Sequence, residues 1–131
     1  MTRLPRRYLP AAAFSLLLLA VSLVPAPETG GPTPELLGVA LDKWVHAGSY
    51  GTLTVLLAWA RDSRTVAAVT LVAAIALGYG GGIELLQGLV ASRSTSAADA
   101  VANAVGAVGG GTVWLATRTA PQTRTWWGSE Q

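Results

Sequence analysis

Long apolar stretches separated by short polar connections dominate the pattern along the 131-residue chain. Four stretches carry no charged residue, and these are Tyr8 to Pro27, Trp44 to Ala60, Thr65 to Ile83 and Ala100 to Thr117. About 20 residues of helix cross the apolar part of a bilayer, so each stretch has the length of one span. The pattern predicts an all-α membrane protein, a compact bundle of four transmembrane helices at about 9–25, 40–60, 65–90 and 97–117.

Composition agrees with this prediction and excludes several classes of protein. Only 12% of the residues are charged, 51% are hydrophobic and none is a cysteine. A soluble domain needs a more polar surface, and a disordered chain needs lower hydrophobicity. Disulfides and zinc sites built on thiolates are excluded by the lack of cysteine. The net charge of +2 does not indicate nucleic-acid binding, because the basic residues flank the apolar stretches.

The distribution of basic residues predicts the topology. Seven of the nine fall on one side of the four segments, namely Arg3, Arg6, Arg7, Arg61, Arg64, Arg118 and Arg124. Basic loops stay in the cytoplasm, so both termini are expected there: a basic N-terminus at 1–8, a membrane domain at 9–118 and a tail at 119–131. Cleavage of the first segment as a signal peptide stays open, although Pro25 and Pro27 crowd the cleavage site after Ala26.

Most of the remaining polar residues gather at one depth of the predicted bundle. A helix rises about 1.5 Å per residue, so Asp42, Glu84 and Asp99 each lie roughly 27 Å above the inner ends of their segments. The residues near this level are Asp42, Lys43, His46, Tyr50, Glu84, Gln87, Arg93, Asp99 and Asn103. We expect them to form one polar pocket that opens to the extracytoplasmic side and binds a ligand.

Glycines at four-residue spacing predict close helix packing. Gly78 and Gly82 form one such pair, and Gly106 and Gly110 form a second pair on the same face as Asn103. Small residues at this spacing let helix backbones approach closely. Pairing of whole subunits through these faces remains open.

Several of the polar residues allow two interpretations. Ser96 to Asp99 matches a capping box, so Asp99 has a role at a helix start as well as in the pocket. Glu84 lies near the carboxyl end of its helix, where the dipole disfavours an anion. It therefore needs Lys43, Arg93 or a protonated His46 as a partner, or it must be a neutral acid.

His46 and Glu84 are the candidates for catalytic proton transfer. Asp42 lies four residues before His46 and could orient its ring. A metal site of His46, Glu84 and Asp99 lacks the close second ligand that such sites normally show, so neither a metal nor a cofactor is expected.

One combination of motifs is similar to a known family. Asp42-Lys43-x-x-His46 with Tyr50, then Glu84-x-x-Gln87, Arg93, Ser96, Asp99, Asn103 and Gly106, resembles the signature of the VanZ-like family, named for a protein of teicoplanin resistance. The resemblance covers roughly residues 36–118 and implies a multi-pass cell-membrane protein that acts on the cell envelope. It supplies no mechanism, and the resistance phenotype is not carried over.

The leading hypothesis is binding of membrane lipids, through an anionic headgroup or a lipid-linked envelope precursor. Lys43 and Arg93 would contact phosphate, while Gln87 and Asn103 would orient the headgroup. The alternatives are a hydrolase or transferase that uses His46 and Glu84 on a lipid-linked phosphate, and an assembly protein without a ligand.

Overall fold

The computed structural model describes residues 5–24, 34–90 and 97–119, and these residues are mostly helical. The elements are η1 (Arg6–Tyr8), α1 (Leu9–Leu23), β1 (Glu35–Leu36), β2 (Val39–Ala40), α2 (Leu41–Arg61), α3 (Val66–Val90) and α4 (Ala97–Thr119). The four predicted segments begin and end within two residues of the four α-helices. Arg93, Ser96 and most of the predicted C-terminal tail lie outside the described residues.

Local sequence explains the tight connection between α2 and α3. Asp62 takes a left-handed backbone conformation with φ of 52°, and the N–H of Ser63 donates to the carbonyl of Ala58 over 2.9 Å. This is the Schellman arrangement that satisfies the last carbonyls of a helix. Thr65 then begins α3, because its hydroxyl accepts a hydrogen bond from the N–H of Ala68 at 3.2 Å.

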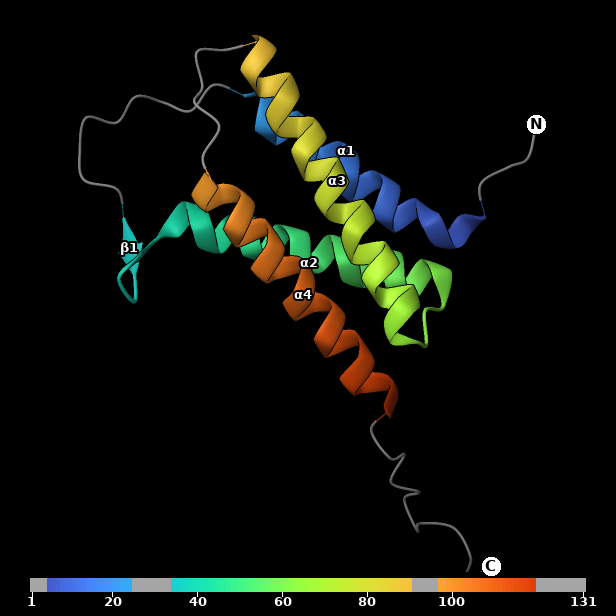
Figure 1. Cartoon of the computed structure of the whole chain (residues 1–131). Helices are drawn as coiled ribbons and strands as arrows, with labels where there is room; N and C mark the ends of the chain where they lie inside the picture. The colour runs from blue at the N-terminus through green and yellow to red at the C-terminus, as the bar shows by residue number, and fades with distance from the viewer. Residues whose placement is uncertain (1–4, 25–33, 91–96, 120–131) are drawn as a thin grey trace, which may run out of the picture.

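The helices alternate in direction along the chain, and α2 lies at the centre of the packing. It contacts α1, α3 and α4, and Figure 1 shows it behind α3 and α4. Contacts between α2 and α4 ascend together, from Lys43 with Asp99 to His46 with Asn103, so these two helices are parallel. Contacts between α1 and α3 also follow the same order along both helices, from Ser15 with Tyr79 to Ser22 with Gln87, so α1 and α3 are parallel.

The apolar core consists of two clusters along α2. One contains Tyr50, Leu53 and Ala76 and is covered by side chains of α1. The other contains Ala58, Val69, Val72 and Trp114 and joins α2 to α3 and α4. Many other large apolar side chains of α1, α3 and α4 are exposed, which suits a lipid-facing surface.

Three described helical segments are long and apolar enough to cross a membrane: Arg6–Leu23, Val66–Gly88 and Ala97–Arg118. Three helices of this length and hydropathy are typical of a membrane protein. The most polar helix, α2, is not among them, because its charged and polar residues lower its hydropathy along the whole helix. A membrane crossing by α2 therefore stays a prediction.

Candidate functional site

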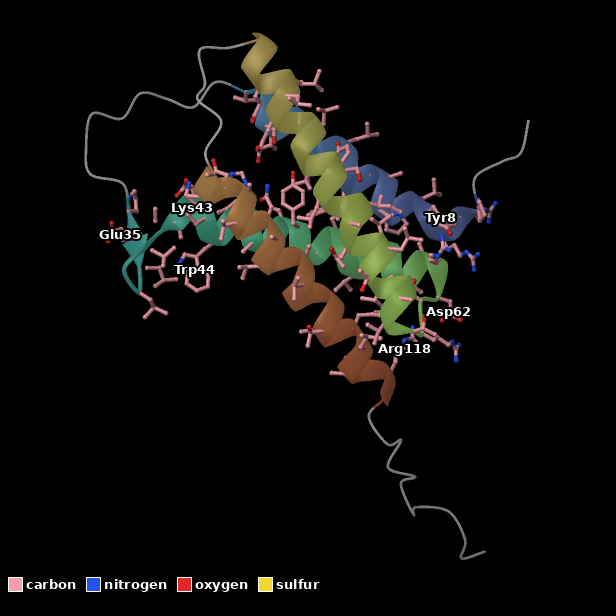
Figure 2. The ribbon with its side chains drawn as sticks, viewed as in Figure 1. Tyr8, Glu35, Lys43, Trp44, Asp62 and Arg118 are labelled. Carbon is pink, nitrogen blue, oxygen red and sulfur yellow. The ribbon has the colours of Figure 1, made fainter. Side chains whose placement is uncertain are left out.

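An ion pair between Lys43 and Asp99 joins the first turns of α2 and α4, and Lys43 also pairs with its neighbour Asp42 on α2. The ammonium of Lys43 lies 2.6 Å from a carboxylate oxygen of Asp42 and also pairs with Asp99. The Lys43 and Asp99 side chains are each 23% exposed, and Asp42 is 50% exposed. Lysine has three N–H donors, so one of them stays available to a further acceptor. Figure 2 labels Lys43 beside the start of α4.

Beside this ion pair, hydrogen bonds link α2 through α4 to α3. The Nδ1 of His46 lies 3.0 Å from the Oδ1 of Asn103, and the Nδ2 of Asn103 donates to the Oε1 of Glu84 over 3.5 Å. An amide oxygen can only accept, so Nδ1 of His46 carries the hydrogen. The other ring nitrogen, Nε2, lies 3.9 Å from Asp99. Neutral His46 therefore presents an unprotonated Nε2.

These contacts define one polar cluster. It consists of Asp42, Lys43, His46, Glu84, Asp99 and Asn103. It draws on α2, α3 and α4, as the depth of the residues in the sequence predicts. Asn103 is 4% exposed, whereas the His46 side chain is 37% exposed. The cluster is thus buried at its centre and open to its surroundings at His46 and Asp42.

The hydrogen bond at Glu84 comes from an unexpected donor. The sequence predicts Lys43, Arg93 or a protonated His46 as the partner of Glu84, or a neutral acid without a cationic partner, and the structure gives the amide of Asn103 as the hydrogen-bond donor. Lys43 lies beside Asp42 and Asp99 instead, because all three belong to the first turns of α2 and α4. The Arg93 alternative lies outside the described residues. Asp99 occupies the first turn of α4, so it has the position expected of a capping acid as well as its place in the cluster.

Two residues predicted to line the site have other neighbours. Gln87 donates its side-chain N–H to the carbonyl of Ser22 over 2.6 Å, which ties α3 to α1. Tyr50 is 6% exposed and belongs to the apolar core, where its ring lies against Gly80. Tyr50 also lies within electrostatic reach of Glu84, so its side chain borders the polar residues of the site.

Glycines lie where α2 and α4 cross closely. A Cβ built on Gly106 would lie 2.6 Å from the carbonyl carbon of Ala47, and one built on Gly110 would lie 2.8 Å from the Cα of Gly51. Neither position has room for a side chain. Gly106 and Gly110 therefore allow the backbones of α2 and α4 to meet.

The other predicted glycine pair has no such role among the described residues. A Cβ on Gly78 or Gly82 meets no atom of another helix within 4 Å, so close packing through this pair within the chain is not observed. The glycine of α3 that does receive a neighbour is Gly80, where a Cβ would lie 2.7 Å from the Tyr50 ring. Gly78 and Gly82 fall on the exposed side of α3 instead.

The opposite end of the bundle holds contacts that the sequence did not indicate. The indole N–H of Trp114 donates to the carbonyl of Ser63 over 2.6 Å, and the guanidinium of Arg118 stacks 4.3 Å from the centre of the indole. Arg64 lies 2.9 Å from Asp62, and its hydrogen bond lowers the pKa of that carboxyl. Figure 2 shows Asp62 and Arg118 at this end.

The carboxyls and the imidazole of the cluster can accept or donate a proton, and its polar side chains can form hydrogen bonds with a ligand. Among residues 5–24, 34–90 and 97–119, no group of three or more His, Asp or Glu side chains could hold a metal ion. Comparisons with models of protein families, with curated proteins and with solved structures find no match.

Proposed function

We propose that this chain is a four-span membrane protein with its arginine-rich end in the cytoplasm. One end of the described bundle carries five arginines and one acid: Arg6, Arg7, Arg61, Arg64, Arg118 and Asp62. The other end carries Lys43 and four acids: Glu35, Asp42, Glu84 and Asp99. This separation agrees with the positive-inside rule, and the alternating helix directions agree with four crossings. The parallel packing of α2 against α4 supports a crossing by α2 despite its low hydropathy.

We further propose that the polar cluster binds the headgroup of an envelope lipid. One observation carries this proposal: ionisable side chains from three helices form a network that is exposed at its outer edge. Burying charges among apolar helices is costly, and ionisable residues within membrane segments commonly mark binding or transport sites. The VanZ-like resemblance involves the same residues and is kept as part of this proposal.

The charge of the cluster limits the kinds of headgroup that it can bind. With His46 neutral, the carboxyls of Asp42, Glu84 and Asp99 outnumber Lys43, so the described part has a net charge of −2 with Glu84 ionised and −1 with Glu84 as a neutral acid. A bare phosphate would be repelled unless Arg93 or a protonated His46 also faces it. A headgroup that carries hydroxyl or amine donors beside its phosphate fits better, because the carboxylates accept from the donors while Lys43 donates to the phosphate. Lipid-linked sugar phosphates and phosphoethanolamine lipids have this chemistry.

A comparison of two aspartates tests the proposal. Asp99→Asn removes the ion pair with Lys43 in the cluster. Asp62→Asn is the control, because it removes an ion pair with Arg64 at the opposite end of the bundle. Short-chain phosphatidylethanolamine, phosphatidylglycerol and a polyprenyl phosphate sugar are titrated against each variant in detergent. Loss of one charge-assisted hydrogen bond lowers affinity about tenfold or more, and we expect this only for Asp99→Asn.

Equal affinity in both variants would refute headgroup binding at the cluster. If Asp99→Asn lowers thermal stability and oligomer formation together, with no lipid effect beyond them, the cluster acts only in helix packing. Lipids that copurify with the wild-type protein, identified by mass spectrometry, give the identity of the natural headgroup.

A hydrolase or transferase remains the second candidate because of the geometry at His46. The Asn103 amide fixes the ring with Nδ1 protonated, which leaves Nε2 free to accept a proton as a general base requires. The chain has a single histidine, so the nitrogen resonances of its imidazole can be assigned directly. If the cluster is catalytic, His46→Gln abolishes turnover of a polyprenyl phosphate substrate and retains its binding. Turnover that persists in His46→Gln excludes this role.

A further inference from the structure

The short β1–β2 hairpin presents an apolar surface beside the polar cluster. Strand β1 pairs antiparallel with β2, and two residues, Leu37 and Gly38, form the turn between them. Leu37 is 85% exposed, which is the largest exposure among the large apolar side chains described. The apolar side chains exposed on the hairpin and on the start of α2 are Leu36, Leu37, Val39, Leu41, Trp44 and Val45.

The turn places a leucine where the backbone disfavours one. Leu37 has φ of 55° and Gly38 has φ of 74°, the pair of positive values typical of a type I′ turn. Asn or Gly is favoured at the first of these positions, because a branched apolar side chain gains nothing there and strains the backbone. Solvent exposure also disfavours a leucine. Both disadvantages are offset if the side chain enters an apolar environment outside the chain.

Hydrogen bonds hold the base of the hairpin against the start of α2. The N–H of Leu41 donates to the carbonyl of Pro34 over 2.8 Å, and the indole N–H of Trp44 donates to the carbonyl of Leu36 over 3.1 Å. Polar backbone groups that enter lipid need internal partners. The Trp44 bond also fastens the hairpin to α2, and Trp44 is 43% exposed.

We infer that the β1–β2 hairpin is an interfacial anchor whose tip inserts Leu37 among the acyl chains of the outer leaflet. Lipid is the occupant that fits, because three helices of the same chain are apolar enough to cross a bilayer. Tryptophan beside the insertion is typical of the membrane interface. Lys43 and Asp42 lie in the same turn of α2 as Trp44, so anchoring would hold the polar cluster at the level of the headgroups.

This inference rests on the proposed membrane placement but not on ligand binding, and the chain allows a direct test because it contains no cysteine. Single cysteines are introduced by Leu37→Cys at the tip, Glu35→Cys at the base of the hairpin, and Leu17→Cys on the exposed face of α1. Each is labelled with bimane and placed in vesicles of phosphatidylethanolamine and phosphatidylglycerol with brominated acyl chains. We expect lipid quenching of the Leu37 label to be about twofold or more stronger than that of the Glu35 label, with the reverse order for aqueous iodide.

Two outcomes would overturn the inference, and they are distinguishable. If the Leu17 label is quenched by brominated lipid but the Leu37 label is quenched only by iodide, the membrane placement stands and the anchor is wrong. If neither label is quenched by lipid, the membrane placement also fails.

A second variant guards against distortion of the turn by cysteine. Leu37→Asn suits the type I′ turn but removes the apolar tip. With the reporter moved to Val39→Cys, Leu37→Asn should lower its lipid quenching while circular dichroism stays unchanged. Unchanged quenching of this reporter would also refute insertion of the tip.

Discussion

Substitution of Gly106 by alanine tests whether backbone contact at one helix crossing holds α2 and α4 together. The added methyl group would lie 2.6 Å from the carbonyl carbon and 2.7 Å from the Cα of Ala47. Both atoms belong to the backbone of a helix, so neither can rotate away as the end of a flexible side chain can. The two helices must therefore separate.

The required movement can be worked from these distances. Ordinary van der Waals contact begins at 3.4 Å, so the carbonyl carbon of Ala47 must move by at least about 0.8 Å relative to α4, and its carbonyl oxygen, which lies nearer still to the added methyl group, must move further. A gap of 0.5–1 Å removes roughly a quarter to a half of the dispersion energy of each contact that it opens. Gly110 against Gly51 lies at the same crossing and opens with it. Overpacking of this kind costs about 1–3 kcal/mol.

Unfolding by SDS in mixed micelles, followed by circular dichroism, measures this cost. Gly109→Ala is the matched control, because a Cβ at Gly109 meets no atom of another helix within 4 Å. Alanine is the better helix former by about 0.5–1 kcal/mol, so Gly109→Ala should be neutral or stabilising. Equal free energies of unfolding for Gly106→Ala and Gly109→Ala would refute the close crossing.

Two further predictions concern the arginine-rich end. Trp114→Phe leaves the carbonyl of Ser63 without its indole donor, and we expect a loss of about 1–3 kcal/mol in the same unfolding assay, whereas a change below about 0.5 kcal/mol would contradict the bond. The Asp62 carboxyl has a pKa below its usual value because Arg64 donates a hydrogen bond to it. Its contribution to stability is therefore complete above the usual pKa and is lost as the pH falls through the lowered one. A carbon NMR titration should show Arg64→Gln raising this pKa, and an unchanged pKa would contradict the assignment.

Much of the fold follows from the spacing of charges. Runs without charge mark the helices, and the turn at Asp62 and the cap at Thr65 use residue types that favour such ends. The hairpin could not be predicted, because β1 and β2 have two residues each and Leu37 contradicts the residue preference of its turn. The sequence also did not show which face of α3 packs against the other helices. Glycines at 78, 80, 81 and 82 lie on several faces of α3, and only the structure shows that Tyr50 packs against Gly80.

The candidate site shows a similar division between what spacing can and cannot predict. Helical rise brings Asp42, Glu84 and Asp99 to one end, because depth depends only on position along a regular helix. Partners depend on rotation about the helix axes and on the helix-crossing distance, which the sequence does not specify. For this reason, the common level was predictable, whereas the Asn103 contact to Glu84 was not.

The glycine crossing and the polar cluster depend on each other. Gly106 lies less than one helical turn from Asn103, and Ala47 directly follows His46. The His46 to Asn103 distance of 3.0 Å therefore requires the backbone approach that Gly106 permits. If α2 and α4 separated by about 0.8 Å, this hydrogen bond would lengthen beyond the usual limit and His46 would lose its fixed tautomer. The close crossing brings the short side chains of His46 and Asn103 into contact, while His46 and Asp42 stay exposed at the edge of the cluster. The proposed headgroup site would therefore depend on Gly106 as well as on the polar residues.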